Sequence, residues 1–268
     1  MTNPSPLSAQ QVERYARHIV LKEIGGPGQQ KLLNAKVLVV GAGGLGAPAL
    51  MYLAAAGVGT LGVVDDDVVA LSNLQRQIIH RADRLGDTKT KSAGETLAGI
   101  NPELTFRAHT ERLTQDNGWD IIRQYDLVID GCDNFETRFL VNDLCYFAKV
   151  PLVSGAVGEF QGQVSTFKGY ESDEAGTPRP TYRCLVPKAP PAGAIPTCAE
   201  AGVLGALTGV IGSMQALEAV KEITGAGTGL AGKLVIYDAL DARFRTIKLP
   251  WDPGNPLNGS APSIKAPV

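Results

Sequence analysis

The chain has 268 residues, enough to bury a sizeable core in one large domain or two small ones. Its net charge of -2 and its 19% of charged residues exclude the strongly basic surface that nucleic-acid-binding proteins carry. The start, Met1–Pro6, lacks the basic and apolar regions of a signal peptide, and the four cysteines form no Cys-x-x-Cys pair. We therefore expect a cytoplasmic protein with free thiols that binds neither nucleic acid nor membrane.

The first motif joins a strand, a glycine turn and a helix. Val37–Val40 is apolar and mostly β-branched, which predicts a fully buried strand, and Leu45–Ala56 predicts an apolar helix. The glycines between them suit a nucleotide-phosphate site. Gly41 allows the tight turn, Gly43 lets the backbone approach a phosphate, and Gly46 lets the helix pack on the strand. The positive end of the helix then faces the anion.

A second strand, Thr60–Val64, ends on Asp65, where this motif places an acid that binds a ribose. A polar segment follows up to Gln77. In it, Arg76 is suited to forked contacts with phosphate oxygens. The alternative interpretation of this segment is a surface loop with charged side chains.

A third candidate is Lys89. Asp87 or Thr88 is suited to capping a helix that runs to about Gly99, which puts Lys89 in the first turn. A lysine there opposes the helix dipole, so it is an unusual choice unless an anion lies near. The alternative is an exposed lysine without a role.

Asp133 lies just after another buried strand, Asp126–Asp130. The carboxyl ends of parallel strands are where ligands bind in open α/β sheets. Asp133 and Asn134 are equally suited to capping the helix predicted over Phe135–Ala148, and the two roles can coexist.

The remaining pattern alternates strands and helices. A first helix is predicted over Ser8–Leu21 and ends at Gly25–Gly28, and an apolar run with five polar side chains, Val203–Thr224, predicts a buried core helix. The other predicted elements are strands over Leu104–Ala108, Pro151–Gly155 and Gly162–Phe167, a short helix near Trp119–Arg123, and a closing hairpin of Lys233–Tyr237 and Phe244–Leu249.

This order predicts an α/β, Rossmann-like fold with a mostly parallel sheet, helices on both faces and an antiparallel extension. We expect one domain over residues 1–268. It contains a mobile crossover loop over about 168–200, rich in Pro, Gly and charge, and a tail over 250–268 that frays.

Three functions compete on these residues. An NAD-dependent oxidoreductase needs a proton donor near the hydride site, yet none of the three histidines follows a strand in the second half of the chain. A nucleotidyl transfer enzyme needs cations for a triphosphate and an acid for Mg²⁺, which Arg76, Lys89 and Asp133 supply. A non-catalytic scaffold needs neither, so the charges favour the transferase.

The motifs also follow one known family in order. They are Arg14–His18, Gly41–Gly46, Asp65–Asp67, Ser72–Gln77, Lys89, Cys132–Asn134 and Thr197–Gly202. With them the chain closely resembles the MoeB/ThiF/HesA family, the bacterial relatives of ubiquitin-activating enzymes, from about Gln11 to Leu249.

The resemblance implies that the C-terminal glycine carboxylate of a small ubiquitin-like sulfur carrier is adenylated with ATP and Mg²⁺. Gly41, Gly43, Gly44 and Gly46 then lie against the nucleotide and Asp65 binds its ribose. Asn73, Arg76 and Lys89 grip the phosphates, and Asp133 holds Mg²⁺. Arg17 comes from a second subunit, which makes the active form a homodimer. The carrier belongs to molybdopterin synthesis, to which Val153–Ala156 and the Cys198 stretch are most similar, or else to thiamine synthesis.

Two features depart from the family or leave a choice open. The family carries a structural zinc on two Cys-x-x-Cys pairs, but the matching positions are Thr181 with Cys184 and Asn255 with Asn258. One thiol is too few for such a site, so we expect no zinc. Cys198 is either a participant in sulfur transfer, as in the thiamine branch, or a passive buried thiol.

Overall fold

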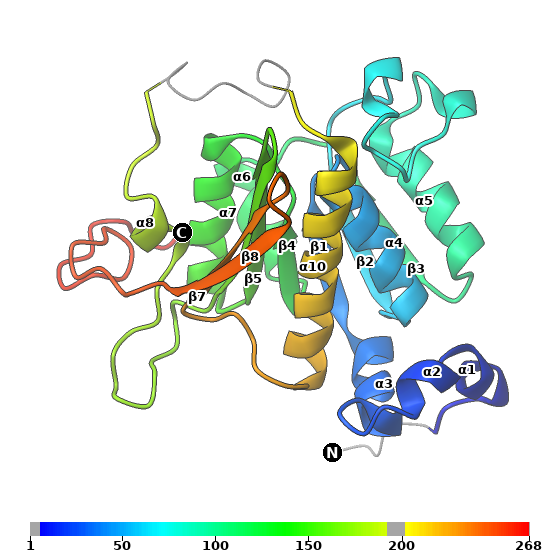
Figure 1. Cartoon of the computed structure of the whole chain (residues 1–268), viewed down its shortest axis with the longest axis horizontal. Helices are drawn as coiled ribbons and strands as arrows, with labels where there is room; N and C mark the ends of the chain where they lie inside the picture. Colours follow the sequence, from blue (N-terminus) through cyan, green and yellow to red (C-terminus); the bar gives the residue numbers. More distant parts are fainter. Residues whose placement is uncertain (1–5, 192–201, 268) are drawn as a thin grey trace.

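The computed structural model describes residues 6–191 and 202–267. Its framework is one eight-stranded sheet with the order β3-β2-β1-β4-β5-β6-β7-β8 (Figure 1). The strands are β1 (Lys36–Val40), β2 (Thr60–Val64), β3 (Thr105–His109), β4 (Leu127–Asp130), β5 (Leu152–Gly158), β6 (Gln161–Phe167), β7 (Lys233–Asp238) and β8 (Arg243–Lys248). The first five are parallel and the last three antiparallel, which confirms the predicted fold class.

Helices cover both faces of the sheet. They are α1 (Ala9–Arg14), α2 (Ala16–Ile19), α3 (Gly25–Asn34), α4 (Gly46–Ala56), α5 (Lys89–Ile100), α6 (Gln115–Ile122), α7 (Phe135–Ala148), α8 (Tyr182–Leu185) and α10 (Gly205–Thr224), with short 3₁₀ turns η1 (Leu71–Asn73) and η2 (Ala82–Arg84). One core lies between the sheet and α4, α5 and α10, and the other between the sheet and α6 and α7. The central strands are buried on both sides because each face is covered.

The N-terminal region differs from the prediction at two points. The single helix predicted over Ser8–Leu21 is divided at Tyr15, which leaves the helical conformation while its ring is buried. The Asn101 side chain donates a hydrogen bond to the Tyr15 hydroxyl, 3.2 Å away. Gly25–Gly28 does not end a helix but begins α3, because Pro27 is tolerated in a first turn, where its missing N–H is not needed.

Helix α2 lies at the amino end of the parallel strands. His18 hydrogen-bonds Gln29 of α3, and the Gln29 amide donates to the carbonyl of Ala56, at the last residue of α4. Helix α4 begins at the glycine turn and has 11 residues, so its two ends are about 16 Å apart. Figure 1 shows α1 and α2 at the opposite end of the molecule from the start of α10.

The crossover and the tail are partly ordered by hydrogen bonds. Up to residue 191 the crossover includes α8, whose Arg183 makes two hydrogen bonds to Asp143 of α7 at 2.8 and 2.7 Å. Residues 192–201, including Cys198, lie outside the described residues, and the mobility of the loop stays a prediction.

The tail does not extend freely from the body, as a frayed segment would. Its Leu257 and Asn255 are each 1% exposed, and the Asn255 amide donates to Thr181 Oγ1 at 2.8 Å and to Cys184 Sγ at 3.0 Å. The sequence pattern suggested fraying because Pro, Gly, Asn and Ser are typical of loose ends, but here the amide groups find buried partners.

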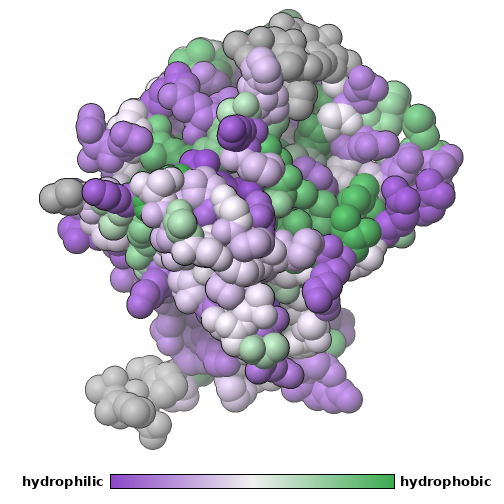
Figure 2. All heavy atoms as spheres, turned by 90° about the vertical axis from the view of Figure 1, so that its left-hand side faces the viewer, coloured by the Kyte–Doolittle hydropathy of each residue, from purple (hydrophilic) through white to green (hydrophobic). Residues whose placement is uncertain are grey.

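The described helices include none with the length and apolarity needed to cross a bilayer. Figure 2 views the molecule from the left-hand side of Figure 1, where the tail lies, and shows hydrophilic and hydrophobic side chains intermixed, with hydrophobic atoms gathered to the right of the view. Elsewhere on the surface, Phe244 and Ile247 of β8 and Leu217 of α10 are exposed apolar side chains.

Replacing Asn255 with alanine tests the anchorage of the tail. Asn255→Ala removes two donors and leaves the N–H of Leu257 without its 2.8 Å acceptor. We expect the free energy of unfolding to fall by about 1–3 kcal/mol in urea denaturation. Ser263→Ala, an exposed change in the same tail, should alter it by less than about 0.5 kcal/mol. Equal stability of the two variants would show that the tail is not held through Asn255.

Candidate nucleotide site

The glycine turn brings α4 against the end of β1. Gly41 has φ +94°, and its N–H donates to the Val64 carbonyl of the neighbouring strand at 2.8 Å. A Cβ on Gly46 would lie 1.9 Å from the Gly41 carbonyl oxygen, which no side chain tolerates. Glycine at these two positions therefore lets the helix start directly at the carboxyl edge of the sheet, with its N–H groups turned outward.

The peptide of Ala42, inside this turn, is held from both sides. Its N–H donates to Asp65 Oδ2 at 2.8 Å, and its carbonyl oxygen lies 3.0 Å from His80 Nε2. Since a carbonyl only accepts, Nε2 carries the proton, and His80 Nδ1 then accepts from the Ser92 hydroxyl at 2.9 Å. Burial lowers the pKa of His80, and the charge of Lys89 lowers it further, so the ring is neutral at pH 7.

Lys89 is buried beside the two acids of this edge. Its Nζ lies 2.6 Å from Asp67 Oδ2 and 3.9 Å from Asp65 Oδ1, and its side chain is 7% exposed. Burial raises the pKa of Asp65, while Lys89 and the N–H groups of Asp67 and Ala42 act in the opposite direction. A buried ammonium at a helix start, held by carboxylates, is a preformed cation for an incoming phosphate.

The polar segment after β2 packs on the start of α10. Asn73 Oδ1 accepts the N–H of Ala70 at 3.1 Å, and the Arg76 guanidinium donates to the Ser72 carbonyl at 3.0 Å. A Cβ on Gly205 would lie 2.2 Å from the Gln75 carbonyl oxygen, so α10 touches the segment directly. These contacts fold the segment against the start of α10, while most of its side chains stay exposed; its role at a phosphate stays a prediction.

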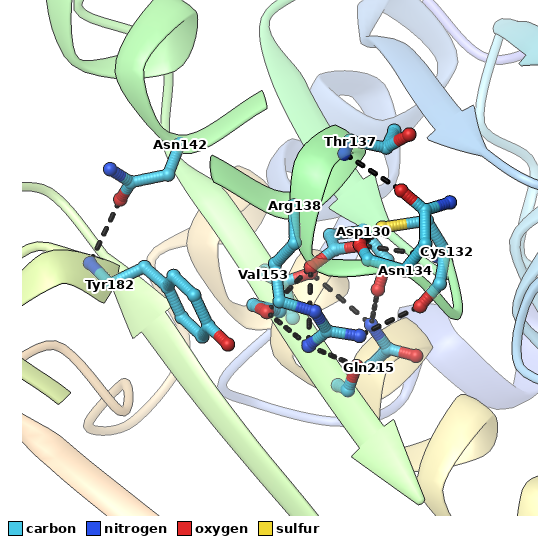
Figure 3. A network of polar contacts seen from close by, with 11 residues as sticks. Asp130, Cys132, Asn134, Thr137, Arg138, Asn142, Val153, Tyr182 and Gln215 are labelled. Carbon is cyan, nitrogen blue, oxygen red and sulfur yellow. Dashed lines mark hydrogen bonds and ion pairs between the residues drawn. The ribbon is translucent and has the colours of Figure 1, made fainter. Parts of the chain in front are cut away.

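Asp133 is carried by a loop that a buried network fixes (Figure 3). Asp130, with no exposed surface, accepts from the Cys132 N–H at 3.0 Å and from the Ser154 hydroxyl at 2.8 Å. The Arg138 guanidinium lies 3.4 Å from Asp130 Oδ2 and donates to the carbonyl of Cys132 at 2.7 Å. Asp133 itself, between Cys132 and the α7 cap, is exposed.

The same network joins the ends of β4 and β5. Arg138 also donates to the Gly155 carbonyl at 2.9 Å, and Gln215 of α10 donates to the carbonyls of Asp130 at 2.7 Å and Val153 at 3.2 Å. Burial of the Cys132 thiol, with the charge of Asp130 beside it, raises its pKa well above its ordinary value. The thiol therefore stays protonated, and it acts as a hydrogen-bond donor to Asp130 and not as a nucleophile.

A cavity of about 590 Å³ adjoins this loop on the α6–α7 face. Its polar lining includes Arg112, Thr114, Glu136, Asp143 and Arg183. The cavity reaches the first turn of α7 at Glu136 and Thr137, and its lining includes neither Asp133 nor a residue of the glycine turn.

Comparison with known proteins identifies the family. The model of the ThiF family matches residues 15–256, which is most of the chain. The chain belongs to the ThiF family. The MoeB/ThiF/HesA resemblance that the motifs indicated is thereby confirmed.

Two curated relatives of this ThiF-family chain are close in sequence. It is 49% identical over 252 residues to the "Probable adenylyltransferase/sulfurtransferase MoeZ" of Mycobacterium tuberculosis, covering 94% of this chain and 64% of that one. It is 47% identical over 254 residues to the "Sulfur carrier protein adenylyltransferase" of Thermus thermophilus, covering 95% and 93%. The chain thus spans less than two thirds of the MoeZ protein.

Solved structures agree on the fold. The crystal structure of E. coli MccB superimposes with a TM-score of 0.78 at 19% identity, over 92% of this chain and 73% of that one. At this identity the likeness shows the ThiF-type fold alone.

Several predicted site residues of this ThiF-family chain share one edge of the sheet. Asp65 accepts a hydrogen bond from the glycine turn, and Lys89 Nζ lies 3.9 Å from Asp65 and donates to Asp67. Gly131, two residues before Asp133, lies against Gly41, since a Cβ on Gly41 would be 3.1 Å from the Gly131 oxygen. Gly44 packs on Thr208 of α10. Among the described residues no hydrogen bond or ion pair joins Arg76, Lys89 and Asp133 to one another, so their shared role stays a prediction.

Two other predicted residues are not part of this grouping. Arg17 is exposed on α2, at the amino end of the strands and the far end of α4. It is therefore too distant to serve the glycine turn of its own chain. Cys198 lies outside the described residues.

Sequence reasoning missed the groups that hold the site in place. His80, Asp130, Arg138 and Gln215 are buried polar side chains with partners on the site loops. One signal was present for Asp130, because an acid as the last residue of a buried strand needs a partner. The partners of His80 and Gln215 are 38 and 85 residues away, which no local pattern reveals.

The positions that match the family's zinc ligands form a hydrogen-bonded cluster. Thr181, Cys184 and Asn255 bond one another, and the Asn258 amide donates to the carbonyls of Gly169 and Arg179 at 3.1 and 2.9 Å. One thiol, one hydroxyl and two amides do not fit the thiolate and imidazole set that a structural zinc requires. That the chain holds no zinc stays a prediction.

The Arg138–Asp130 ion pair can be tested by comparing the removal of one charge with the removal of both. Arg138→Gln leaves the buried Asp130 carboxylate without its cation, and we expect a loss of about 3–5 kcal/mol of unfolding free energy. Adding Asp130→Asn should recover part of the loss, because no charge then stays buried. Arg123→Gln, in the exposed pair with Asp120, should change stability by less than about 0.5 kcal/mol. A double variant no more stable than Arg138→Gln would argue against the charge pair.

Proposed function

We propose that this chain catalyses the ATP-dependent adenylation of the C-terminal glycine carboxylate of a small ubiquitin-like sulfur-carrier protein, with release of pyrophosphate. The observation that carries the proposal is the buried Lys89, held by Asp65 and Asp67 beside the glycine turn. The Thermus thermophilus relative, a sulfur carrier protein adenylyltransferase, supports the same chemistry.

In this reaction an oxygen of the glycine carboxylate attacks the α-phosphorus of ATP. The bond between the α-phosphorus and its bridging oxygen breaks, pyrophosphate leaves with both electrons, and an acyl adenylate remains. The step needs no protein nucleophile, so positioning and charge stabilisation carry it.

The roles follow from where each group lies. The N–H groups after Ala42 and the positive charges of Lys89 and Arg76 suit the phosphate chain. The amide N–H₂ of Asn73 is proposed to donate to the phosphates as well, because the hydrogen bond with the Ala70 N–H uses only the amide oxygen. Asp65 has used two of its lone pairs on N–H groups and keeps others for a ribose hydroxyl.

Asp133 is the residue that we propose to hold Mg²⁺. Its carboxylate is exposed at the carboxyl edge, and a hard cation prefers such oxygen ligands. When bound, the ion neutralises part of the triphosphate charge. The chain's own contribution is the buried Asp130–Arg138 network, which fixes the loop on which Asp133 stands.

We further propose a homodimer in which Arg17 reaches the site of the partner chain. The support is its exposed position at the far end of the molecule, from which it cannot serve its own glycine turn. This also accounts for two arginines, Arg14 of α1 and Arg17 of α2, at the end of the molecule away from the start of α10.

For the pathway we propose the molybdopterin branch, on the resemblance of Val153–Ala156 and of the Cys198 stretch, with the thiamine-pathway carrier as the alternative. An NAD-dependent oxidoreductase fits less well. Hydride transfer to a substrate needs a proton donor at the site, whereas Lys89 and Arg76 are two cations that suit a triphosphate. The role of Cys198 and a cytoplasmic location stay predictions.

The direct test mixes the protein with candidate carriers and MgATP and follows the mass of the carrier. We expect a gain of one adenylate on the molybdopterin carrier, and ATP–pyrophosphate exchange that depends on the carrier. Asp133→Ala should reduce the exchange to background, because its carboxylate is placed for the metal, while Asp173→Ala, in the crossover, should leave it unchanged. Exchange at the wild-type rate in Asp133→Ala would refute the assignment.

Mixing two inactive variants tests the shared site. Arg17→Ala and Asp133→Ala, each inactive alone, should regain about a quarter of the wild-type exchange when their dimers are dissociated and reassembled. Half of the random dimers are mixed, and each of these has one site with both residues intact. Absence of any recovery, with mixed dimers present, would place Arg17 in its own chain's site, and wild-type activity of Arg17→Ala alone would place it outside the reaction.

A further inference from the structure

Gln77 is a buried side chain at the proposed site with an unsatisfied polar atom. It is 4% exposed, and its Oε1 has no hydrogen-bond partner among residues 6–191 and 202–267. Its backbone is fixed, because its N–H donates to the Asn73 carbonyl at 2.9 Å and its carbonyl accepts from the His80 N–H at 3.0 Å. The main chain at Gln77 is thus fixed, and burial of the side chain among its neighbours restricts where the amide group can lie.

The Gln77 amide faces the glycine turn across a small space. A Cβ built on Gly43 meets nothing closer than Gln77 Nε2, at 3.8 Å. Gly43 is the position at which the backbone is expected to approach a phosphate, so the amide forms the opposite wall of that approach.

Leaving a buried amide oxygen without a partner is unfavourable, and at the edge of a proposed binding site an incoming ligand is one source of the missing partner. A nucleotide brings both kinds of partner: phosphate oxygens accept from Nε2–H, and a ribose hydroxyl or a water carried by the metal donates to Oε1. Neighbouring Arg76 and His80 fix the surroundings, so the amide needs no rearrangement to meet them.

We propose that Gln77 is a further nucleotide-binding residue: its Nε2–H donates to a phosphate oxygen beside Gly43, and its Oε1 accepts an O–H that enters with the nucleotide. This rests on the proposed function, because it takes the ligand to be a nucleoside triphosphate.

A ligand-binding role and a structural role for Gln77 predict different effects of its replacement on the stability of the protein without nucleotide. An amide that bonds only to the ligand can be replaced by an apolar side chain of similar length without cost to the empty fold. A structural amide could not be replaced in this way. The informative variants are therefore Gln77→Met, which removes both polar atoms, and Gln77→Glu, which keeps the shape but sets a negative charge against the phosphates.

The experiment measures the melting temperature without ligand and the dissociation constant of a non-hydrolysable ATP analogue with Mg²⁺ by calorimetry. Gln77→Met should melt within about 3 °C of the wild type and bind the analogue about tenfold more weakly. Gln77→Glu should bind at least about a hundredfold more weakly. The matched control is Gln124→Glu, the same change at an exposed position at the end of α6, which should bind as the wild type does.

Wild-type affinity in both Gln77 variants would overturn the proposal, and so would a large fall in the melting temperature of Gln77→Met with unchanged affinity in Gln77→Glu. Failure of the proposed function looks different: the wild type would bind the analogue, with the Gln77 effects intact, yet adenylate none of the carriers. A wild type that binds no nucleotide would overturn both.

Discussion

The candidate site depends on one peptide group, that of Ala42. Its N–H is held by Asp65 at the end of β2 and its carbonyl by His80. With both ends fixed, the peptide cannot rotate, and the N–H groups that follow it keep one direction. Lys89 lies 3.9 Å from Asp65 and is held by Asp67 at 2.6 Å, so the groups proposed to bind phosphate are already arranged at this edge in the protein without a ligand.

The fold could be predicted because its signals are local. Each signal is carried by residues that are close in the sequence. Examples are the apolar strand that runs into a glycine turn, and the capping side chain that accepts the N–H three residues further on. Asn134 and Thr88 cap α7 and α5 as expected, and Gly57 ends α4 in the left-handed conformation. Lys89 was found for a related reason, since its unfavourable place in a first turn is visible in the sequence alone.

The support of the site could not be predicted, because it is built from contacts between distant segments. Arg138 finds the carbonyls of Cys132 and Gly155, and Gln215 reaches from α10 to the ends of β4 and β5. Tyr15 interrupts a helix whose periodicity continues past it, because its ring is drawn into a pocket beside Asn101. In each case tertiary burial outweighs the local preference.

The attachment of the tail bears on how the protein responds to its surroundings. A metal clasp releases all of its ligands at once when a chelator removes the ion. The contacts of Asn255 and Asn258 are separate hydrogen bonds to separate partners, and each breaks on its own. A tail fastened by these hydrogen bonds can loosen by degrees on warming, without a single step at which all of the contacts are lost.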